Sequence, residues 1–283
     1  MKSYLDCIPC FFEQALRAGR IVTDDEKVLK HLLDRLGAML SEISLDNTPP
    51  ETGRLIYRLV SEITGHPDPF RELKLQSTRQ ALAKYPYLKQ TINQSDDPLL
   101  TAVRIAIAGN VIDFGANAAF DMDTAVDESL IKDFAICDYT EFKNRLAAAG
   151  HVLYIGDNAG ETVFDRLLIE QMDKPTTFVV RARPIINDAT RDDAVAAGID
   201  KVATIVSSGT DAPGTILSTC NSAFIGMLQK SQFTIAKGQG NYEALSNESL
   251  PIFFLLKTKC RIIADDIGVN QGDIILKGIN IND

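Results

Sequence analysis

The chain has 283 residues and a formal net charge of −9, with 45% hydrophobic and 24% charged residues. This composition is typical of a soluble globular protein, and it excludes a disordered chain, a collagen-like repeat and a small scaffold held by disulfides. Because an acidic surface repels phosphate backbones and anionic lipids, nucleic acid and membrane are poor candidates for partners.

Cysteine usage and the N-terminal residues predict a compartment. The five cysteines are too few and too scattered for a disulfide framework, which favours a reducing environment. Acidic residues interrupt the N-terminal segment, which lacks the apolar core of a signal peptide. The longest apolar runs, such as Ile252–Leu256, are far shorter than the roughly 20 residues needed to cross a bilayer. We therefore expect a cytoplasmic protein.

The first elements along the chain are predicted to be helices. Apolar residues between Val28 and Leu40 recur at helical spacing and form one continuous stripe. Further helices are expected over Glu51–Ile63, Phe70–Tyr85 and Leu99–Phe114, separated by turn-forming residues. The region up to about residue 150 is thus predicted to be helical, and we place a helical N-terminal region at 1–95.

After residue 150 the pattern changes to short apolar runs, each followed by a polar or glycine-rich loop and a helical stretch. Continuous apolar runs at this spacing indicate βα units whose strands are buried on both faces of a parallel sheet. The sequence predicts an α/β fold, a three-layer Rossmann-like and mostly parallel sheet over 96–283, with the helical region packed against it. The predicted strands are Val152–Ile155, Thr177–Val180, Val202–Val206, Phe233–Ala236, Ile252–Leu256 and Ile274–Leu276.

Carboxylate and amide side chains gather in the loops after the first two predicted strands. Asp157 and Asn158 follow the first strand and Asp188 follows the second. In an open parallel sheet these loops share one edge, where ligands bind. Two carboxylates and one amide suit a hard divalent ion such as Mg²⁺ or Mn²⁺ and leave room for water and a substrate oxygen. The alternative is that these residues cap the helices that begin near them.

Positive charge gathers in the same loops of this acidic chain. Concentrated in one cleft, such cations would attract a small anion such as phosphate, and nearby glycines would let backbone N–H groups approach it. The alternative is that each side chain is a solvated loop charge. The cations are Arg181, Arg183, Lys237, Lys257 and Lys259, and the glycines are Gly209, Gly214, Gly238 and Gly240.

Five motifs follow the predicted strands in chain order: Gly156-Asp157-Asn158-Ala159-Gly160-Glu161, Arg183-Pro184 with Asn187-Asp188, Ser207-Ser208-Gly209-Thr210-Asp211, Lys237-Gly238-Gln239-Gly240-Asn241-Tyr242-Glu243, and Lys257-Thr258-Lys259-Cys260. Together they resemble the DUF89 family, the damage-control phosphatases with an ARMT1-like metal-binding fold. The resemblance extends to Cys7-Ile8-Pro9-Cys10 and to the segment 108–115, so it covers essentially the whole chain.

The resemblance implies a divalent-metal-dependent phosphatase for small phosphorylated metabolites, in the branch with an N-terminal CxxC. It implies a metal held at Asp157, Asn158 and Asp188, and this oxygen and amide ligand set suits Mn²⁺, Co²⁺, Ni²⁺ or Mg²⁺. Glu161 is a candidate for orienting water, although a helix dipole also favours glutamate in a first turn. The candidate substrate-binding residues are Asn110, Asp113, Arg183, Ser208, Gly209, Lys237 and Lys259.

Two motifs keep alternative interpretations. Asn110 and Asp113 would share one helix face and either complete the pocket or form a hydrogen-bonded pair at a helix end. Cys7 and Cys10 lack the further ligands of a structural zinc site and the strand that precedes a thioredoxin-like CxxC. We therefore expect them to pack as small apolar residues, with metal or redox chemistry as the alternative.

The leading hypothesis is hydrolysis of a phosphate monoester by metal-activated water. A covalent aspartyl-phosphate route is less favoured, because the first loop reads Asp157-Asn158-Ala159 rather than DxD. One alternative is an S-adenosylmethionine-dependent carboxyl methyltransferase, against which the first loop lacks GxGxxG spacing. The other is a non-catalytic module that binds metal or a phosphometabolite.

Overall fold

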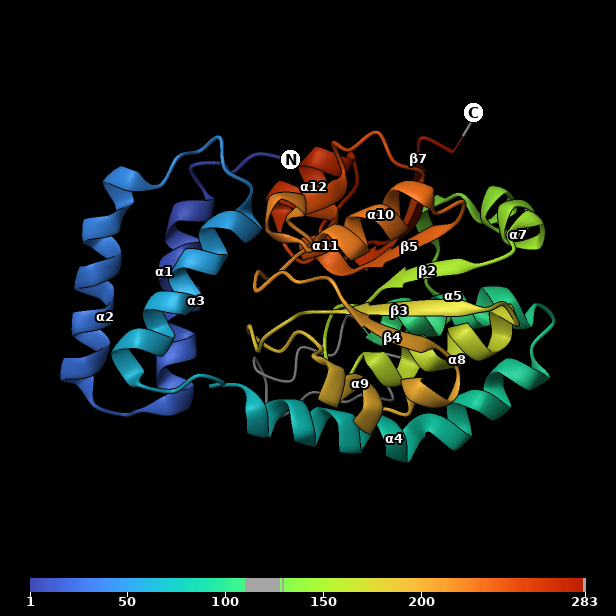
Figure 1. Cartoon of the computed structure of the whole chain (residues 1–283), viewed down its shortest axis with the longest axis horizontal. Helices are drawn as coiled ribbons and strands as arrows, with labels where there is room; N and C mark the ends of the chain where they lie inside the picture. Colours follow the sequence, from blue (N-terminus) through green and yellow to red (C-terminus); the bar gives the residue numbers. More distant parts are fainter. Residues whose placement is uncertain (110–127, 129, 282–283) are drawn as a thin grey trace.

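In the computed structural model, which describes residues 1–109, 128 and 130–281, a seven-stranded sheet lies between two layers of helices (Figure 1). The predicted three-layer α/β fold is confirmed. All neighbouring strands are parallel except β6 and β7, which are antiparallel. The strands are β1 (Phe134–Cys137), β2 (Val152–Ile155), β3 (Thr176–Val180), β4 (Thr204–Ser207), β5 (Thr234–Lys237), β6 (Ile252–Lys257) and β7 (Ile274–Ile279), in the order β1-β7-β6-β5-β2-β3-β4.

The sequence pattern locates six of these strands but misses β1. Every residue of β2 and β3 is buried, which explains why both appear as continuous apolar runs. By contrast, β1 is a four-residue edge strand whose residues are alternately half-buried and exposed. It is paired with β7, which lies far away in the sequence. The prediction of helix up to about residue 150 was wrong here, because this strand depends on a distant partner.

The sheet has a switch point between β2 and β5. From β2 the chain proceeds outward through β3 and β4, and it then returns to place β5 on the other side of β2. The loops that follow β2 and β5 therefore diverge from neighbouring positions at the carboxyl edge of the sheet. Such a crevice is where open α/β sheets bind their ligands.

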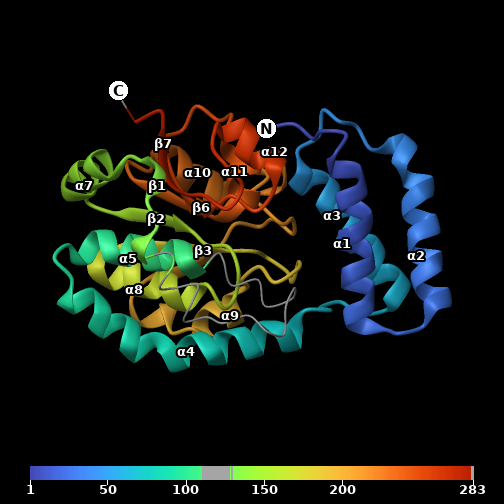
Figure 2. The same cartoon turned by 180° about the vertical axis from the view of Figure 1, so that it is seen from behind.

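Helices cover both faces of the sheet, as the reverse view also shows (Figure 2). One face packs against α4, α5, α7, α8 and α9, and the other against α10, α11 and α12. These helices are α4 (Arg71–Gln94), α5 (Pro98–Gly109), α7 (Tyr139–Ala148), α8 (Thr162–Met172), α9 (Arg191–Ala196), α10 (Ser222–Lys230), α11 (Gly238–Leu245) and α12 (Arg261–Ile267), with short 3-10 turns at Leu40–Glu42, Ile199–Lys201 and Leu217–Thr219.

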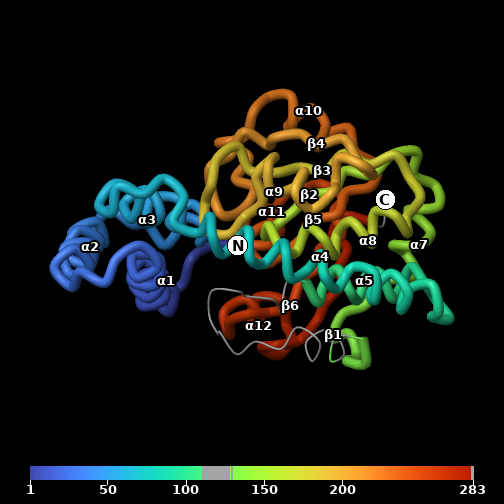
Figure 3. Tube along the Cα trace, turned by 90° about the horizontal axis from the view of Figure 1, so that it is seen from below, coloured from blue at the N-terminus to red at the C-terminus, as the bar shows by residue number. Residues whose placement is uncertain are grey.

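The first three helices form a body beside the sheet (Figure 3). They are α1 (Cys7–Val22), α2 (Glu26–Met39) and α3 (Pro49–Thr64), and their buried side chains form a core of their own. In contrast, α4 contributes Ala81, Leu88 and Ile92 to the core beneath the sheet. Because α3 also contacts α11, the carboxyl edge of the sheet faces this helical body.

Local signals fix where α3 begins and ends. Thr48 and Glu51 form a reciprocal capping box, and prolines occupy the first helical positions. The helix ends at Thr64 and is capped by Gly65, whose φ of +71° lies in the left-handed region that glycine adopts without strain. Among the described helices, none is long and apolar enough to cross a membrane.

Candidate active site

The loops after β2 and β3 are joined by their backbones. Asn158 and Asp188 form an isolated antiparallel bridge. On either side of it, the amide of Ala159 donates to the carbonyl of Asn187 at 2.8 Å, and the amide of Ala189 donates to the carbonyl of Asp157 at 2.7 Å. This bridge holds the two loops in register, so that residues about 30 positions apart in the sequence share one site.

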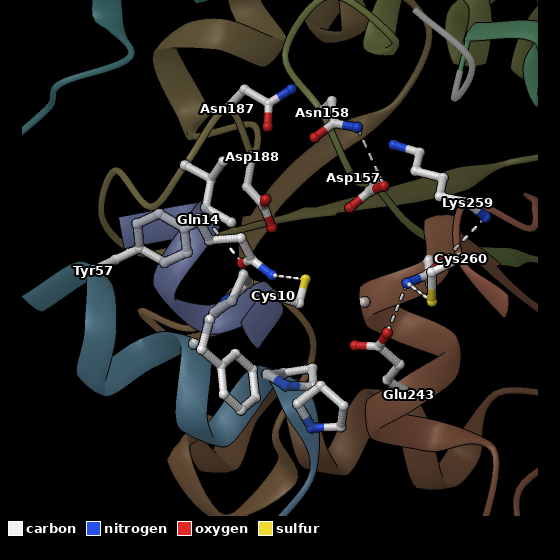
Figure 4. A pocket seen from close by; sticks show the side chains of 18 of the residues that line it. Cys10, Gln14, Tyr57, Asp157, Asn158, Asn187, Asp188, Glu243, Lys259 and Cys260 are labelled. Carbon is white, nitrogen blue, oxygen red and sulfur yellow. Dashed lines mark hydrogen bonds between the residues drawn. The ribbon is translucent and has the colours of Figure 1, made fainter. Parts of the chain in front are cut away.

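The side chains of Asp157, Asn158 and Asp188 point toward one another in the resulting pocket (Figure 4). All three are nearly buried, with exposed fractions of 8%, 9% and 4%. Asn158 Nδ2 donates to Asp157 Oδ2 at 3.3 Å, which orients the amide oxygen away from that carboxylate. The structure therefore brings the three predicted metal-binding residues together.

Gly156 allows this loop to leave β2 without a clash. A Cβ at this position would lie 2.6 Å from the ring of Phe178, so any other residue would displace that buried side chain. The carbonyl of Gly156 accepts a hydrogen bond from Asn241 at 3.1 Å. The loop is thus held by a side chain of β3 on one side and by a residue of α11, the helix that follows β5, on the other.

Arg181 fixes the position of Asp188. Its guanidinium is 2% exposed and donates from Nε to Asp188 Oδ2 at 2.7 Å. The two terminal nitrogens donate to Thr215 at 2.9 Å and to Asn241 at 3.1 Å. With its guanidinium buried and bound in this way, Arg181 supports a site carboxylate, whereas the sequence had grouped it with the phosphate-attracting cations.

A second buried network lies directly behind Asn158. Asn158 Nδ2 also donates to Glu161 Oε2 at 3.2 Å, and the other oxygen of Glu161 is 2.5 Å from the ammonium of Lys237. That ammonium also donates to Asp165 and to the carbonyl of Ala106, both at 2.7 Å. Lys237 is fully buried and all three of its protons are engaged. It therefore lies behind the pocket rather than in its lining.

Burial and like charge raise the pKa of the site carboxylates. For Asp157, desolvation is the main cause and the negative charges of Glu161 and Asp188 add to it, so its pKa lies well above the ordinary value. Desolvation also raises the pKa of Asp188, although Arg181 opposes this effect. An acidic site with this charge balance is stabilised by a bound cation.

The chemistry of the donor set fits a divalent ion. Asp157 and Asp188 offer carboxylate oxygens and Asn158 an amide oxygen, which are ligands for a hard cation with open positions left for water and substrate. No set of three or more histidine, cysteine, aspartate or glutamate side chains is placed to hold a metal in the described part of the chain. A site of two carboxylates and one amide is consistent with that finding.

These residues lie in a pocket of about 390 Å³ between the sheet edge and the helical body. Lys259, an exposed residue of the loop after β6, lines this pocket, and its side chain reaches toward Asp157 (Figure 4). Its positive charge acts to lower the pKa of both Asp157 and Asp188. Its ammonium makes no ion pair or hydrogen bond with any residue that the structure describes, so it is available to an anionic ligand.

The CxxC motif belongs to the same pocket. Cys7 is half-buried and Cys10 exposed, both line the pocket, and Cys260 lies across from Cys10 (Figure 4). Although the Cys10 residue is exposed, desolvation of the sulfur atoms at the pocket wall raises the pKa of both the Cys7 and the Cys10 thiol. Cys7 packs partly buried against the core of the helical body, as expected, whereas the same expectation is wrong for Cys10, which is exposed because the N-terminus of α1 faces the pocket. Gln14 donates to Cys10 Sγ at 3.1 Å and accepts from Tyr57 at 3.1 Å.

The remaining predicted residues lie elsewhere. Arg183 and Gly209 line a separate hollow, and the hydroxyl of Ser208 is buried and donates to the carbonyl of Val180 at 3.0 Å. Asn110 and Asp113 lie outside the described residues.

Sequence reasoning missed the pocket wall that the helical body supplies, including Gln14 and Tyr57. The only sequence signal for it was the CxxC, two residues on one side of the first helix.

Comparisons with known proteins identify relatives over nearly the whole chain. A family model described as the damage-control phosphatase ARMT1-like domain matches residues 3–275. A damage-control phosphatase from Archaeoglobus fulgidus is 36% identical, over 96% of this chain and 97% of the relative. One from Pyrococcus horikoshii is 34% identical over 97% of each chain, and an uncharacterized protein from Methanocaldococcus jannaschii is 34% identical over 96% of this chain and 93% of its own length.

The fold agrees with these sequence matches. The crystal structure of a DUF89 family protein from Pyrococcus horikoshii superimposes with a TM-score of 0.90 and 32% sequence identity. The match covers 98% of this chain and 99% of that protein.

Proposed function

The chain belongs to the damage-control phosphatase ARMT1-like family, and from this premise we propose that it is a divalent-metal-dependent phosphatase acting on phosphate monoesters of small metabolites. One observation carries the proposal. The backbone bridge between Asn158 and Asp188 gathers Asp157, Asn158 and Asp188 in a pocket that Lys259 also lines. Phosphoryl transfer requires oxygen ligands that hold a metal ion and, beside them, a positively charged side chain that can bind the phosphate.

Asp157, Asn158 and Asp188 are the residues we assign to the metal, with Mn²⁺, Co²⁺, Ni²⁺ and Mg²⁺ as candidates. When bound, a divalent ion supplies Lewis acidity toward a phosphoryl oxygen and lowers the pKa of a coordinated water. The two carboxylates neutralise the ion and the amide completes an oxygen-rich set. The near-complete burial of all three side chains limits competition from bulk water.

Lys259 is assigned to the transferred phosphate. Its ammonium lies on the Asp157 side of the pocket, where it can neutralise phosphoryl oxygens as negative charge spreads over them in the transition state. A lysine on an exposed loop can also adjust its position to substrates of different shape.

Arg181 and Glu161 are assigned as positioning residues. Arg181 holds Asp188 through a 2.7 Å ion pair, and Glu161 accepts from Asn158 while pairing with Lys237 at 2.5 Å. Fixed ligand side chains lower the reorganisation needed when metal and substrate bind. In this interpretation Lys237 acts through Glu161 and does not touch the substrate.

The test is phosphate release from p-nitrophenyl phosphate after chelation and after addition of each candidate metal separately. We expect activity to vanish in chelator and to return with at least one metal. Asp157→Asn and Asp188→Asn should lose about a hundredfold or more in turnover, whereas Asp24→Asn, an exposed aspartate between α1 and α2, should match the wild type. Full activity in excess chelator would overturn the proposal.

A further inference from the structure

The pocket continues beyond the proposed metal residues as a groove. Tyr57, Phe70 and Ile186 line the 390 Å³ pocket and also an adjoining hollow of about 350 Å³. That hollow in turn shares Arg54, Arg58, Arg183 and Asp211 with a third hollow of about 510 Å³. Three consecutive hollows thus connect the proposed metal-binding residues with a group of arginines that lies between α3 and the loops after β3 and β4.

The middle of this groove is largely apolar. Its walls include Pro69 and Phe70, which directly precede α4, and Pro184, Ile185 and Ile186 from the loop after β3. These side chains offer contact to a carbon chain or ring but few hydrogen bonds. A substrate that extends through the groove would therefore place a weakly polar segment here.

The far end has the opposite character. Arg54 and Arg58 both form ion pairs with Asp211, and the distance from Arg58 to Asp211 is 3.4 Å. Arg183 is exposed and makes no ion pair or hydrogen bond among the described residues. Three guanidinium groups and one carboxylate line this hollow, which leaves positive charge in excess although the whole chain carries −9.

Two further features favour an anion at this end. The first is Ser218, which lines this hollow and contributes a hydroxyl. The second is that the arginines outnumber what a structural contact needs. Arg54 and Asp211 alone would suffice to tie α3 to the loop after β4. That contact does not need Arg58, whose side chain is 51% exposed, or Arg183.

We propose that this arginine cluster, Arg54, Arg58 and Arg183, binds a second anionic group of the substrate. The inference rests on the proposed phosphatase function and narrows its substrate class. The substrate is a phosphate monoester whose reacting phosphate lies at Asp157 and Asp188, joined through a weakly polar segment to a distal phosphate or carboxylate. Guanidinium groups bind either anion through paired N–H donors.

The test compares substrates that differ only at the distal end. A series of α,ω-alkanediol bisphosphates, from propane to octane, is assayed against the alkyl monophosphates and the ω-carboxyalkyl phosphates of equal length. For at least one length we expect kcat/KM to favour a doubly anionic substrate over the monophosphate by about tenfold or more, the value of one charge-assisted hydrogen bond. The carboxylate arm shows which anion is preferred.

Variants then locate the preference. In the double variant Arg58→Ala with Arg183→Ala, the ratio of kcat/KM between doubly and singly anionic substrates should fall about tenfold. Arg58→Lys with Arg183→Lys should retain part of the ratio. Arg35→Ala, which removes an exposed arginine on α2, should keep the wild-type ratio. Because the ratio is taken within one variant, a general loss of activity cancels.

Calorimetric titration of hexanediol bisphosphate gives a readout that does not depend on turnover. We expect the wild type to bind it about tenfold more tightly than the double arginine variant does. A ratio near one for every chain length, or equal ratios and affinities in the double variant and the wild type, would overturn the second subsite. Failure of the phosphatase assignment would differ, since p-nitrophenyl phosphate would then remain intact with every metal.

Discussion

Asp157→Asn should stabilise the metal-free protein and destabilise the metal-loaded one relative to the wild type. The Asp157 carboxylate is 8% exposed and lies near Asp188 and Glu161, whose charges disfavour its ionised form. Without a cation, the folded chain holds this carboxylate at a cost that the unfolded chain does not bear. The amide has the same shape, keeps a hydrogen-bonding oxygen and carries no charge.

The expected magnitudes follow from the burial and the proposed ligand role. Removing a buried carboxylate whose ionised form is disfavoured is worth about 2 kcal/mol of unfolding free energy, or about 4–8 °C in Tm for a chain of this size. A divalent ion at about a thousand times its Kd adds about 4 kcal/mol to a protein that binds it only when folded. The unfolding free energy of the wild type should therefore be about 2 kcal/mol lower than that of Asp157→Asn in chelator, and about 2 kcal/mol higher in saturating metal.

The assay is thermal and urea unfolding of both proteins, in chelator and in saturating Mn²⁺. Asp24→Asn controls for the loss of one negative charge at an exposed position, and it should follow the wild type in both conditions. The reasoning would be refuted if Asp157→Asn were the less stable protein in chelator. An equal gain from metal in both proteins would refute the ligand assignment alone.

Three further predictions concern other residues of the pocket. Lys259→Ala should leave calorimetric metal affinity unchanged while kcat/KM falls by a factor that corresponds to about 2 to 4 kcal/mol of transition-state stabilisation, and Lys230→Ala, at an exposed position of α10, should change neither quantity. Burial raises the pKa of Glu243 to about 7, so its ionisation costs the folded state on the order of 3 kcal/mol, a loss that develops as the pH rises from about 4.5 to 7. Glu243→Gln should therefore be more stable than wild type at pH 8 and equal to it at pH 4, by urea titration. Cys7→Ser with Cys10→Ser should keep turnover within about threefold, because partial desolvation raises the pKa of both thiols and disfavours their thiolates, and complete loss of turnover in a folded double variant would contradict this.

The sequence by itself determined the fold class and the residues that meet at the sheet edge. Strands buried on both faces appear as continuous apolar runs, and β2 matches its predicted bounds at both ends. Parallel strands place their following loops at one edge, so Asp157, Asn158 and Asp188 could be expected to lie together. Both inferences follow from local periodicity and from a general property of parallel sheets, which need no knowledge of distant contacts.

Only the tertiary structure decided what each cation contacts. Lys237 and Lys259 both come after predicted strands and look equivalent in the sequence. The structure encloses the ammonium of Lys237 between Glu161 and Asp165, whereas Lys259 lines the pocket. Arg183, a third cation that follows a predicted strand, lines the hollow at the far end of the groove rather than the pocket of Asp157 and Asp188. These differences arise because partners from distant parts of the chain set the burial and charge around each side chain, and the local sequence encodes neither.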